Sequence, residues 1–190
     1  GSVFWLATLM ATLAEIDEWV NYLIRKNSGN FGLLHGQHVM STALSKGVPA
    51  NLLQLDSIQM LQNRYDKVVG FVDHSVSSIS PALAVAKGAC LVTKHLAPWE
   101  GWIGPDSDIC MTPDDWRETK NLFLYAYVAG GASKELSLHE LSDRQAHRRS
   151  LYSRHALKTG HLLCDDDIVA LRPFHPDSPA SLLPSLIGKK

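Results

Sequence analysis

The clearest pattern in the chain lies in two stretches, KVVGFVDH at residues 67–74 and ACLVTKH at residues 89–95. Each is a run of apolar and β-branched residues typical of a strand buried on both faces, and each ends in a charged residue and a histidine. The expected strands are residues 67–72 and 89–94, and residues 80–87 between them have the composition of a short helix. A strand, a helix and a second strand in this order predict a βα unit with parallel strands.

Similar segments alternate on both sides of this unit. Residues 3–8 and 31–35 are expected strands, and residues 12–23, 52–61 and 113–128 are expected helices. The last of these has a strong start signal, because a threonine, a proline and two acidic residues follow one another there. Strands that alternate with helices predict an α/β fold built on a parallel sheet.

Histidines follow three of the expected strands at the point where each strand ends: His35, His74 and His95. The carboxyl ends of parallel strands meet at one edge, where β/α barrels carry their catalytic groups. Neutral imidazoles backed by carboxylates suit Mn, Fe or Zn, so His74 and His95 together predict a metal site. For any one of the three, a hydrogen-bonded histidine with a structural role is the alternative interpretation.

The composition is that of a globular protein without a bulk charge, since 45% of the 190 residues are hydrophobic and the formal net charge is -1. This balance gives no electrostatic reason to bind nucleic acid or an anionic membrane. The longest uncharged apolar stretch, residues 3–14, is about half as long as a membrane span requires. Three widely spaced cysteines without a Cys-x-x-Cys pair favour a reducing compartment, and we expect a cytoplasmic protein.

The character of the chain changes near residue 145. From there short β-type stretches and turns replace the alternating strands and helices, and basic residues outnumber acidic ones. We therefore expect three parts: an α/β region at residues 3–131, a linker at residues 132–144 and a small β-rich module at residues 145–190.

Several segments together form a specific combination. Residues 69–75, VGFVDHS, are similar to a GFSDHT motif, and residues 88–96, GACLVTKHL, are similar to a GAxxIEKHF motif. Residues 104–106 match GPD, and residues 10–16 match a MATLxEI helix start. Residues 149–173 resemble part of an SAF (antifreeze-like) domain. In this combination the chain resembles the sialic acid synthases, a family that includes N-acetylneuraminate, legionaminate and pseudaminate synthases and spore-coat polysaccharide proteins.

The resemblance implies the C-terminal half of a TIM-type (β/α)8 barrel in residues 3–131 and a partial SAF domain in residues 145–190. The family's working unit is a domain-swapped homodimer, in which Arg172 would reach into the barrel mouth of the other subunit. Segments that precede the position of Val3 in the family supply an acidic residue and lysines. A half-barrel leaves two sheet edges and apolar strand faces open, so we expect this chain to be stable only with the other half of a barrel, as a dimer or by association.

The resemblance also implies a reaction. Phosphoenolpyruvate would condense with an N-acylated amino sugar of the N-acetylmannosamine type, giving a nonulosonic acid for polysaccharide biosynthesis and releasing phosphate. His74 and His95 would bind a divalent metal, Mn2+ first, with Mg2+ or Co2+ as alternatives, which would act as a Lewis acid on the sugar aldehyde. Asp106 would bind sugar hydroxyls, so His74, His95 and Asp106 are the expected catalytic residues. The guanidinium of Arg172 suits a polar or acidic substrate.

Some positions depart from the family pattern. The family's STGM segment is ATLM at residues 7–10, and its LLHC segment is LLHG at residues 33–36, followed by His38 where Asn or Ser is usual. Thr8 and His38 join Asp106 and Arg172 as the expected substrate-binding residues. The metal ligands of the family are thus kept, whereas several phosphate and sugar contacts are changed.

Two other functions remain open. A catalytically degenerate paralogue, or a fragment, would keep the scaffold and bind only sugar or metal, which the changed phosphate contacts favour. A metal-dependent aldolase on a related barrel would need a Schiff-base or enolising group, and no residue is assigned to that role. The intact DHS, KH and GPD segments favour the synthase.

Overall fold

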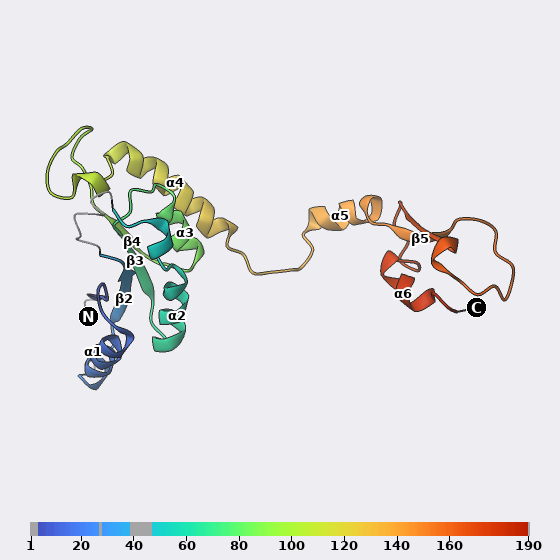
Figure 1. Cartoon of the computed structure of the whole chain (residues 1–190), viewed down its shortest axis with the longest axis horizontal. Helices are drawn as coiled ribbons and strands as arrows, with labels where there is room; N and C mark the ends of the chain where they lie inside the picture. Colours follow the sequence, from blue (N-terminus) through green and yellow to red (C-terminus); the bar gives the residue numbers. More distant parts are fainter. Residues whose placement is uncertain (1–3, 27, 39–46, 190) are drawn as a thin grey trace. The chain divides into compact units, whose positions relative to one another are not determined.

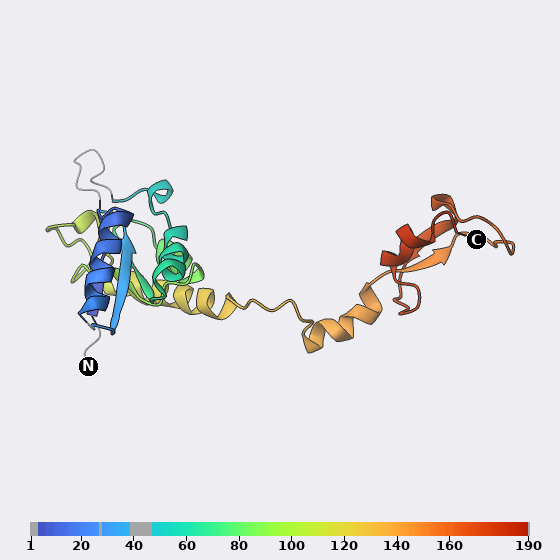
Figure 2. The ribbon, with the colours of Figure 1, turned by 90° about the horizontal axis from the view of Figure 1, so that it is seen from below.

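The computed structural model describes residues 4–26, 28–38 and 47–189 (Figure 1). The chain divides into two compact units, Gly1–Gly131 and Ala132–Lys190. Each unit has a sheet of its own, and Figure 2 shows the units from a second direction.

The first unit is built on four parallel strands in the order β1-β2-β3-β4. The strands are β1 (Phe4–Ala7), β2 (Phe31–Gly36), β3 (Val69–Asp73) and β4 (Val92–Lys94). Leu33 of β2 lies opposite Val69 of β3, and Asp73 at the end of β3 lies opposite Lys94 at the end of β4. Parallel neighbours need a crossover connection between them, and the helices provide it.

Four helices follow the strands: α1 (Leu13–Arg25), α2 (Asp56–Tyr65), α3 (Ser80–Ala86) and α4 (Pro113–Ala129), with 3-10 turns η2 (Ala50–Leu52) and η3 (Ser107–Ile109). Capping boxes start α1 and α4, because Thr12 and Thr112 each exchange hydrogen bonds with the third helical residue. Within the described ranges, no helix is both long and apolar enough to cross a membrane.

The core of the first unit lies between the central strands and helices α1 and α2. Leu33, Val69 and Phe71 from β2 and β3 pack with Ile58 of α2, and each of the four is 0% exposed or nearly so. A shift of one residue in strand register would turn these side chains to the other face. Their burial therefore fixes the register, and with it the positions at which β3 and β4 end.

The prediction of an α/β fold with a parallel sheet is confirmed. All four expected strands are present, although Val3 lies outside the described residues and β4 is shorter than residues 89–94. The helix expected at residues 52–61 is displaced, since η2 ends at Leu52 and α2 begins at Asp56. The backbone of Gln54 between them is left-handed, with φ 46°, and such a residue interrupts a right-handed helix.

The second unit is small and irregular. Its elements are α5 (Leu138–His147), β5 (Ser150–Ser153), η4 (Asp165–Asp167), β6 (Ile168–Leu171), η5 (Ala180–Leu182) and α6 (Leu183–Leu186), and β5 pairs antiparallel with β6. Residues 132–144 were expected to form a linker, and α5 begins in the second half of this range. Ser137 and Glu140 form the capping box that starts this helix.

Candidate metal and sugar site

Two of the three predicted histidines lie together at the carboxyl edge of the sheet. His74 follows the last residue of β3, and His95 follows the last residue of β4. Because Asp73 and Lys94 are register partners, the next residues along the two strands are neighbours. The ring centroids of His74 and His95 are 5.3 Å apart.

His38, in the segment after β2, extends this pair to a row of three imidazoles. Its ring centroid lies 4.9 Å from that of His74, and the planes are inclined by 49°. His38 was predicted as a substrate-binding residue, and the structure places it directly beside the candidate metal ligands. We call His38, His74 and His95 the histidine row.

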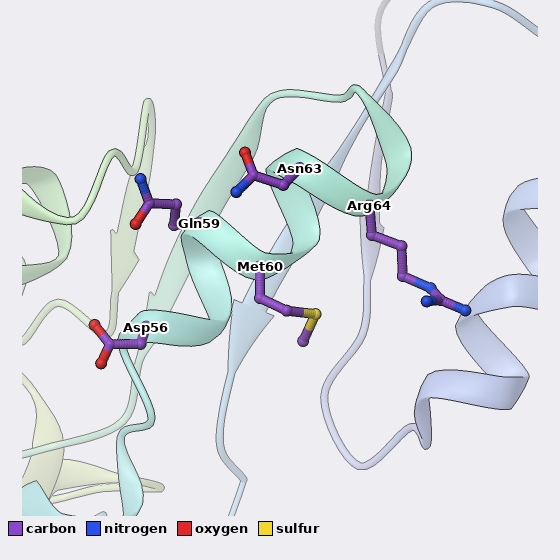
Figure 3. A pocket seen from close by; sticks show the side chains of 5 residues that line it. All are labelled: Asp56, Gln59, Met60, Asn63 and Arg64. Atoms are coloured by element: carbon purple, nitrogen blue, oxygen red, sulfur yellow. The ribbon is translucent and has the colours of Figure 1, made fainter.

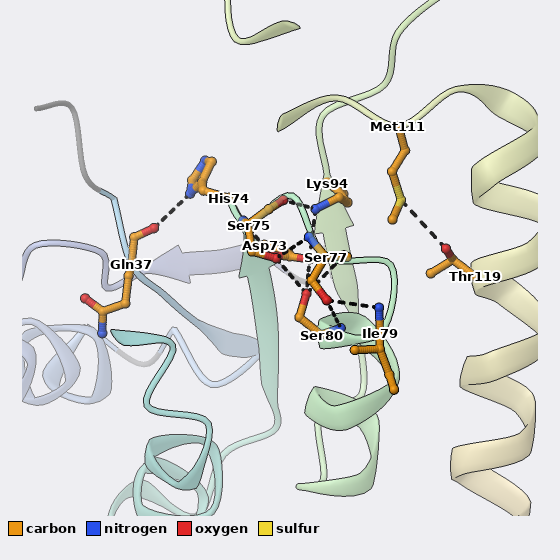
Figure 4. A network of polar contacts seen from close by, with 10 residues as sticks. All are labelled: Gln37, Asp73, His74, Ser75, Ser77, Ile79, Ser80, Lys94, Met111 and Thr119. Carbon is orange, nitrogen blue, oxygen red and sulfur yellow. Dashed lines mark hydrogen bonds and ion pairs between the residues drawn. The ribbon is translucent and has the colours of Figure 1, made fainter. Parts of the chain in front are cut away.

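The ring of His74 is held so that one nitrogen is free. Its Nδ1 lies 3.0 Å from the backbone oxygen of Gln37 (Figure 4). A carbonyl oxygen only accepts hydrogen bonds, so Nδ1 carries the proton and Nε2 keeps its lone pair. Burial lowers the pKa of His74, and the neighbouring His38 and His95 lower it further. His74 is therefore neutral at neutral pH, which is the form that binds a metal ion.

The backbone of His74 is clamped by the segment that returns toward η2. The N–H of Val48 donates to the backbone oxygen of His74 at 2.9 Å. Gly47 approaches the same oxygen so closely that a Cβ atom there would lie 2.7 Å from it, and its φ of +82° also favours glycine.

Asp106 lies next to the outer member of the histidine row. Its carboxylate is 3.8 Å from Nδ1 of His95, which is longer than a hydrogen bond. The side chains of His95 and Asp106 are 40% and 52% exposed, so both are open to a ligand. Asp106 stands at a left-handed turn, φ 57°, directly before η3. Asp106 thus lies beside His95, which in turn lies beside His74.

His35 does not belong to the row. It is 6% exposed, and its Nε2 lies 3.1 Å from the backbone oxygen of Leu53. Burial lowers the pKa of His35 as well, although its backbone hydrogen bonds oppose this. For this residue the structural alternative, a buried and hydrogen-bonded histidine, describes what is found.

The structure shows no contact of Thr8 with the histidine row among its described hydrogen bonds, and Arg172 belongs to the other unit. Thr8 is buried, and its hydroxyl donates to the backbone oxygen of Leu34 at 2.9 Å. Arg172 belongs to the second unit, where its Nε donates to the backbone oxygen of His147 at 2.8 Å. The predicted substrate roles of both residues stay predictions.

A buried ion pair below the row is a feature that the sequence analysis missed. Asp73 and Lys94 have side chains only 0% and 1% exposed, and Nζ of Lys94 lies 3.0 Å from the Asp73 carboxylate. Asp73 also accepts hydrogen bonds from the backbone N–H of Ser75 at 2.8 Å and from the hydroxyl of Ser80 at 2.6 Å. Figure 4 shows this network at the ends of β3 and β4. Its signal in the sequence is that Asp73 and Lys94 directly precede the two histidines.

The donor set of the row partly fits a divalent metal. In the described ranges, no group of three or more His, Cys, Asp and Glu side chains is arranged to hold a metal ion. His74 and His95 would therefore contribute two imidazole ligands, and water or substrate would supply the others. Imidazole suits Zn, Cu, Fe and Ni, whereas Mn2+ prefers oxygen ligands, which water or substrate would have to provide here.

A separate hollow lies on the outer side of α2. It has a volume of about 730 Å³ and is lined by Asp56, Gln59, Met60, Asn63 and Arg64 (Figure 3). Arg64 is engaged by Asp17 of α1 at 2.6 Å. The hollow contains no residue of the row, and we assign no function to it.

Comparison with known proteins matches the first unit to a family. The family model described as "NeuB family" matches residues 2–134. N,N'-diacetyllegionaminic acid synthase of Legionella pneumophila is 30% identical over 139 residues, which are 73% of this chain and 39% of the relative. Pseudaminic acid synthase of Campylobacter jejuni is 28% identical over 142 residues, or 73% of this chain and 40% of the relative.

Solved structures show the same architecture. The N-acetylneuraminic acid synthetase of Leptospira borgpetersenii aligns with a TM-score of 0.63 and 25% identity, over 74% of this chain and 47% of that one. A spore coat polysaccharide biosynthesis protein E of Chromobacterium violaceum aligns with a TM-score of 0.63 and 21% identity, over 90% of this chain and 50% of that one. The parallel sheet thus has the fold of part of these proteins, and the chain spans half of their length or less.

Proposed function

The chain belongs to the NeuB family, and we propose that it forms part of a synthase that condenses phosphoenolpyruvate with an N-acylated amino sugar. Relatives that make legionaminic and pseudaminic acid support a nonulosonic acid as the product. The observation that carries the proposal is the pair His74 and His95, two neighbouring imidazoles of which one has a fixed, unprotonated Nε2.

The proposed reaction joins two carbon atoms and releases phosphate. The methylene carbon of phosphoenolpyruvate bonds to the aldehyde carbon of the open-chain sugar, water adds to the neighbouring carbon, and phosphate leaves from it. A divalent cation, with Mn2+ as the first choice, would act as a Lewis acid that polarises the aldehyde when bound. His74 and His95 are the residues that would hold it.

The remaining residues of the site would orient the sugar. Asp106 has a half-exposed carboxylate beside His95, and it is free to accept hydrogen bonds from sugar hydroxyls. His38 stands on the other side of His74 and would contact the substrate from there. As the family resemblance implies, Arg172 would reach the site from the SAF-type second unit of a partner subunit in a domain-swapped dimer. The expected compartment is the cytoplasm.

A metal- or sugar-binding protein without synthase activity is the second candidate. The observation that favours it is Thr8, whose hydroxyl already donates its proton to Leu34 and lacks a free donor for a phosphate group. Under this alternative His74 and His95 would still hold a metal ion, or the site would bind a sugar, but no phosphate would be released from phosphoenolpyruvate.

Calorimetric titration with Mn2+ tests the site. We expect micromolar binding that is lost in the His74→Ala/His95→Ala double variant. The matched control is His139→Ala/His147→Ala, which removes two exposed histidines of α5 and leaves binding unchanged. Binding together with phosphate release from phosphoenolpyruvate and N-acetylmannosamine supports the synthase, and binding alone supports the second candidate. A folded protein that binds no Mn2+ contradicts the synthase and leaves only a sugar-binding form of the second candidate.

A further inference from the structure

We propose that the buried pair of Asp73 and Lys94 is a positioning device that sets the separation of His74 and His95. The inference rests on the proposed function, because its consequence is the affinity of the two histidines for a divalent metal ion. Neither residue is a catalytic residue in this proposal, since both side chains are almost completely buried.

The ladder between β3 and β4 ends one residue before the two histidines, and the backbone oxygen of each histidine accepts a hydrogen bond from a different segment of the chain. β3 and β4 share only three register pairs, and the last of them is Asp73 with Lys94. Both histidines come one residue beyond this last pair. Their separation therefore depends on contacts other than those of the strand ladder.

Lys94 supplies such contacts on both sides of His74. Its ammonium group binds the carboxylate of Asp73 at 3.0 Å, one residue before His74. The same group donates to the backbone oxygen of Ser75, one residue after His74. Because Lys94 itself directly precedes His95, one side chain ties the residues that flank His74 to the residue next to His95.

The other end of the pair is anchored to a helix. Ser80, the first residue of α3, donates to Asp73 at 2.6 Å, and its hydroxyl is 2.8 Å from that of Ser75. In the described part of the chain no buried side-chain nitrogen or oxygen lacks a hydrogen-bond partner. The pair therefore has one well-defined geometry, which is the property that a positioning device needs.

Stability alone is a weak explanation for this pair. Taking a carboxylate and an ammonium group out of water costs about as much as their attraction returns, so apolar residues of similar size often do as well. Groups that orient metal ligands, by contrast, change metal affinity by about 10- to 100-fold when they are altered.

The test compares variants of the full 190-residue chain. Lys94→Met removes the ammonium group and nearly keeps the volume. Asp73→Asn/Lys94→Met removes the charge of both partners, so it folds even if the single variant does not, because no buried charge is left alone. The matched control is Ile58→Ala, which makes a cavity among the buried apolar residues of the core and removes no hydrogen bond of the pair.

Two quantities are measured at a temperature where every variant is folded. The first is the Mn2+ dissociation constant by calorimetry. The second needs no metal: the nuclear Overhauser effect between ring protons of His74 and His95, with that between His35 and Phe71, whose ring centroids are 6.2 Å apart, as a reference for native packing.

We expect the double variant to bind Mn2+ about 10- to 100-fold more weakly, to lose the His74–His95 signal and to keep the His35–Phe71 signal. Ile58→Ala should change neither quantity beyond twofold. An unchanged His74–His95 signal in the double variant overturns the inference. If the parent chain binds no Mn2+, the proposed function fails, and the ring-proton signals still decide whether the pair positions the histidines.

Discussion

The two units of the chain both place histidines near a buried aspartate, but they use the carboxylate in different ways. In the first unit Lys94 and Ser80 occupy the carboxylate of Asp73, and the rings of the histidine row contact one another instead. In the second unit the carboxylate of Asp167 meets two imidazoles directly, Nε2 of His155 at 3.0 Å and Nε2 of His161 at 2.7 Å.

This difference determines what each cluster is able to bind. The Asp167 carboxylate occupies one nitrogen of each neighbouring imidazole, so that cluster joins segments of its own unit. The Asp73 carboxylate is neutralised by a lysine, so the adjacent imidazole nitrogens stay open to a ligand. A carboxylate near histidines in the sequence therefore does not by itself show whether the imidazoles are free to bind a ligand.

The largest expected loss of stability comes from removing the charge of Asp73 while Lys94 keeps its own. Asp73→Asn leaves the charge of Lys94 buried without a counterion, which costs about 3–5 kcal/mol of unfolding free energy. Urea denaturation followed by circular dichroism measures the loss. Adding Lys94→Met should restore most of it, and a single variant as stable as the parent would show that the pair is not buried in solution.

A smaller effect is expected in how the stability of each unit depends on pH. Burial lowers the pKa of His35, so the unfolded chain binds that proton more tightly than the folded one. The stability of the first unit is therefore complete above the ordinary histidine pKa and falls as the pH drops below it. His35→Gln keeps a donor for Leu53 and should flatten this slope, measured as the urea midpoint against pH.

Part of that slope should remain in His35→Gln, because burial also lowers the pKa of His74. His139→Gln, an exposed change in α5, is the control and should leave the slope as it is in the parent. A slope that is identical in the parent and in His35→Gln would contradict the burial of His35.

In the second unit Asp167 should cause a loss of stability at more acid pH than His35 does in the first. Hydrogen bonds from the backbone N–H of Cys164 and from His161 hold the pKa of Asp167 well below its usual range. Its contribution is present above the ordinary aspartate pKa and is lost as the pH falls through the lowered value. Asp167→Asn should remove this acid-dependent loss. The measurement is the melting temperature of the second unit, Ala132–Lys190, followed through its amide NMR signals at a series of acid pH values. An unchanged acid profile would show that the cluster does not form.

The smallest effects should be equal in the two units. Thr112→Ala and Ser137→Ala each remove a capping side chain, from α4 and α5 respectively, and each should cost about 1 kcal/mol. Urea denaturation measures both. A marked difference would show that one helix contributes little to the stability of its unit. Equal losses would show that the two units differ in how they use their buried carboxylates and not in how their helices are capped.

The sequence predicted the parts of the fold that depend on local pattern. The apolar runs that end at Asp73 and Lys94 predicted parallel strands, and parallel strands place the next residues at one edge. For that reason His74 and His95 were correctly expected to be neighbours. The expected strand ended at His35, whereas β2 continues to Gly36, so His35 lies within the strand on the same face as the buried Leu33 and contacts Leu53 in the core.

Other features escaped prediction because they depend on side-chain contacts across the fold. The bond between Lys94 and Ser75 requires knowledge of the strand register, which residue types do not reveal. Helix α5 was hidden in an expected linker because its surface is mostly polar, although the capping pair Ser137 and Glu140 was readable. The metal and the substrate roles of Asp106 and Arg172 still come from resemblance.

The close approach of Gly47 to the backbone oxygen of His74 has a consequence for mutational tolerance. A residue that offers no functional group is here as constrained as a metal ligand, because any side chain would push the His74 backbone out of place. In a library of variants selected for metal binding, glycine at position 47 should be retained as strictly as histidine at position 74. A position near this edge can therefore reject substitutions because there is no room for a side chain, and not only because its own side chain binds a ligand.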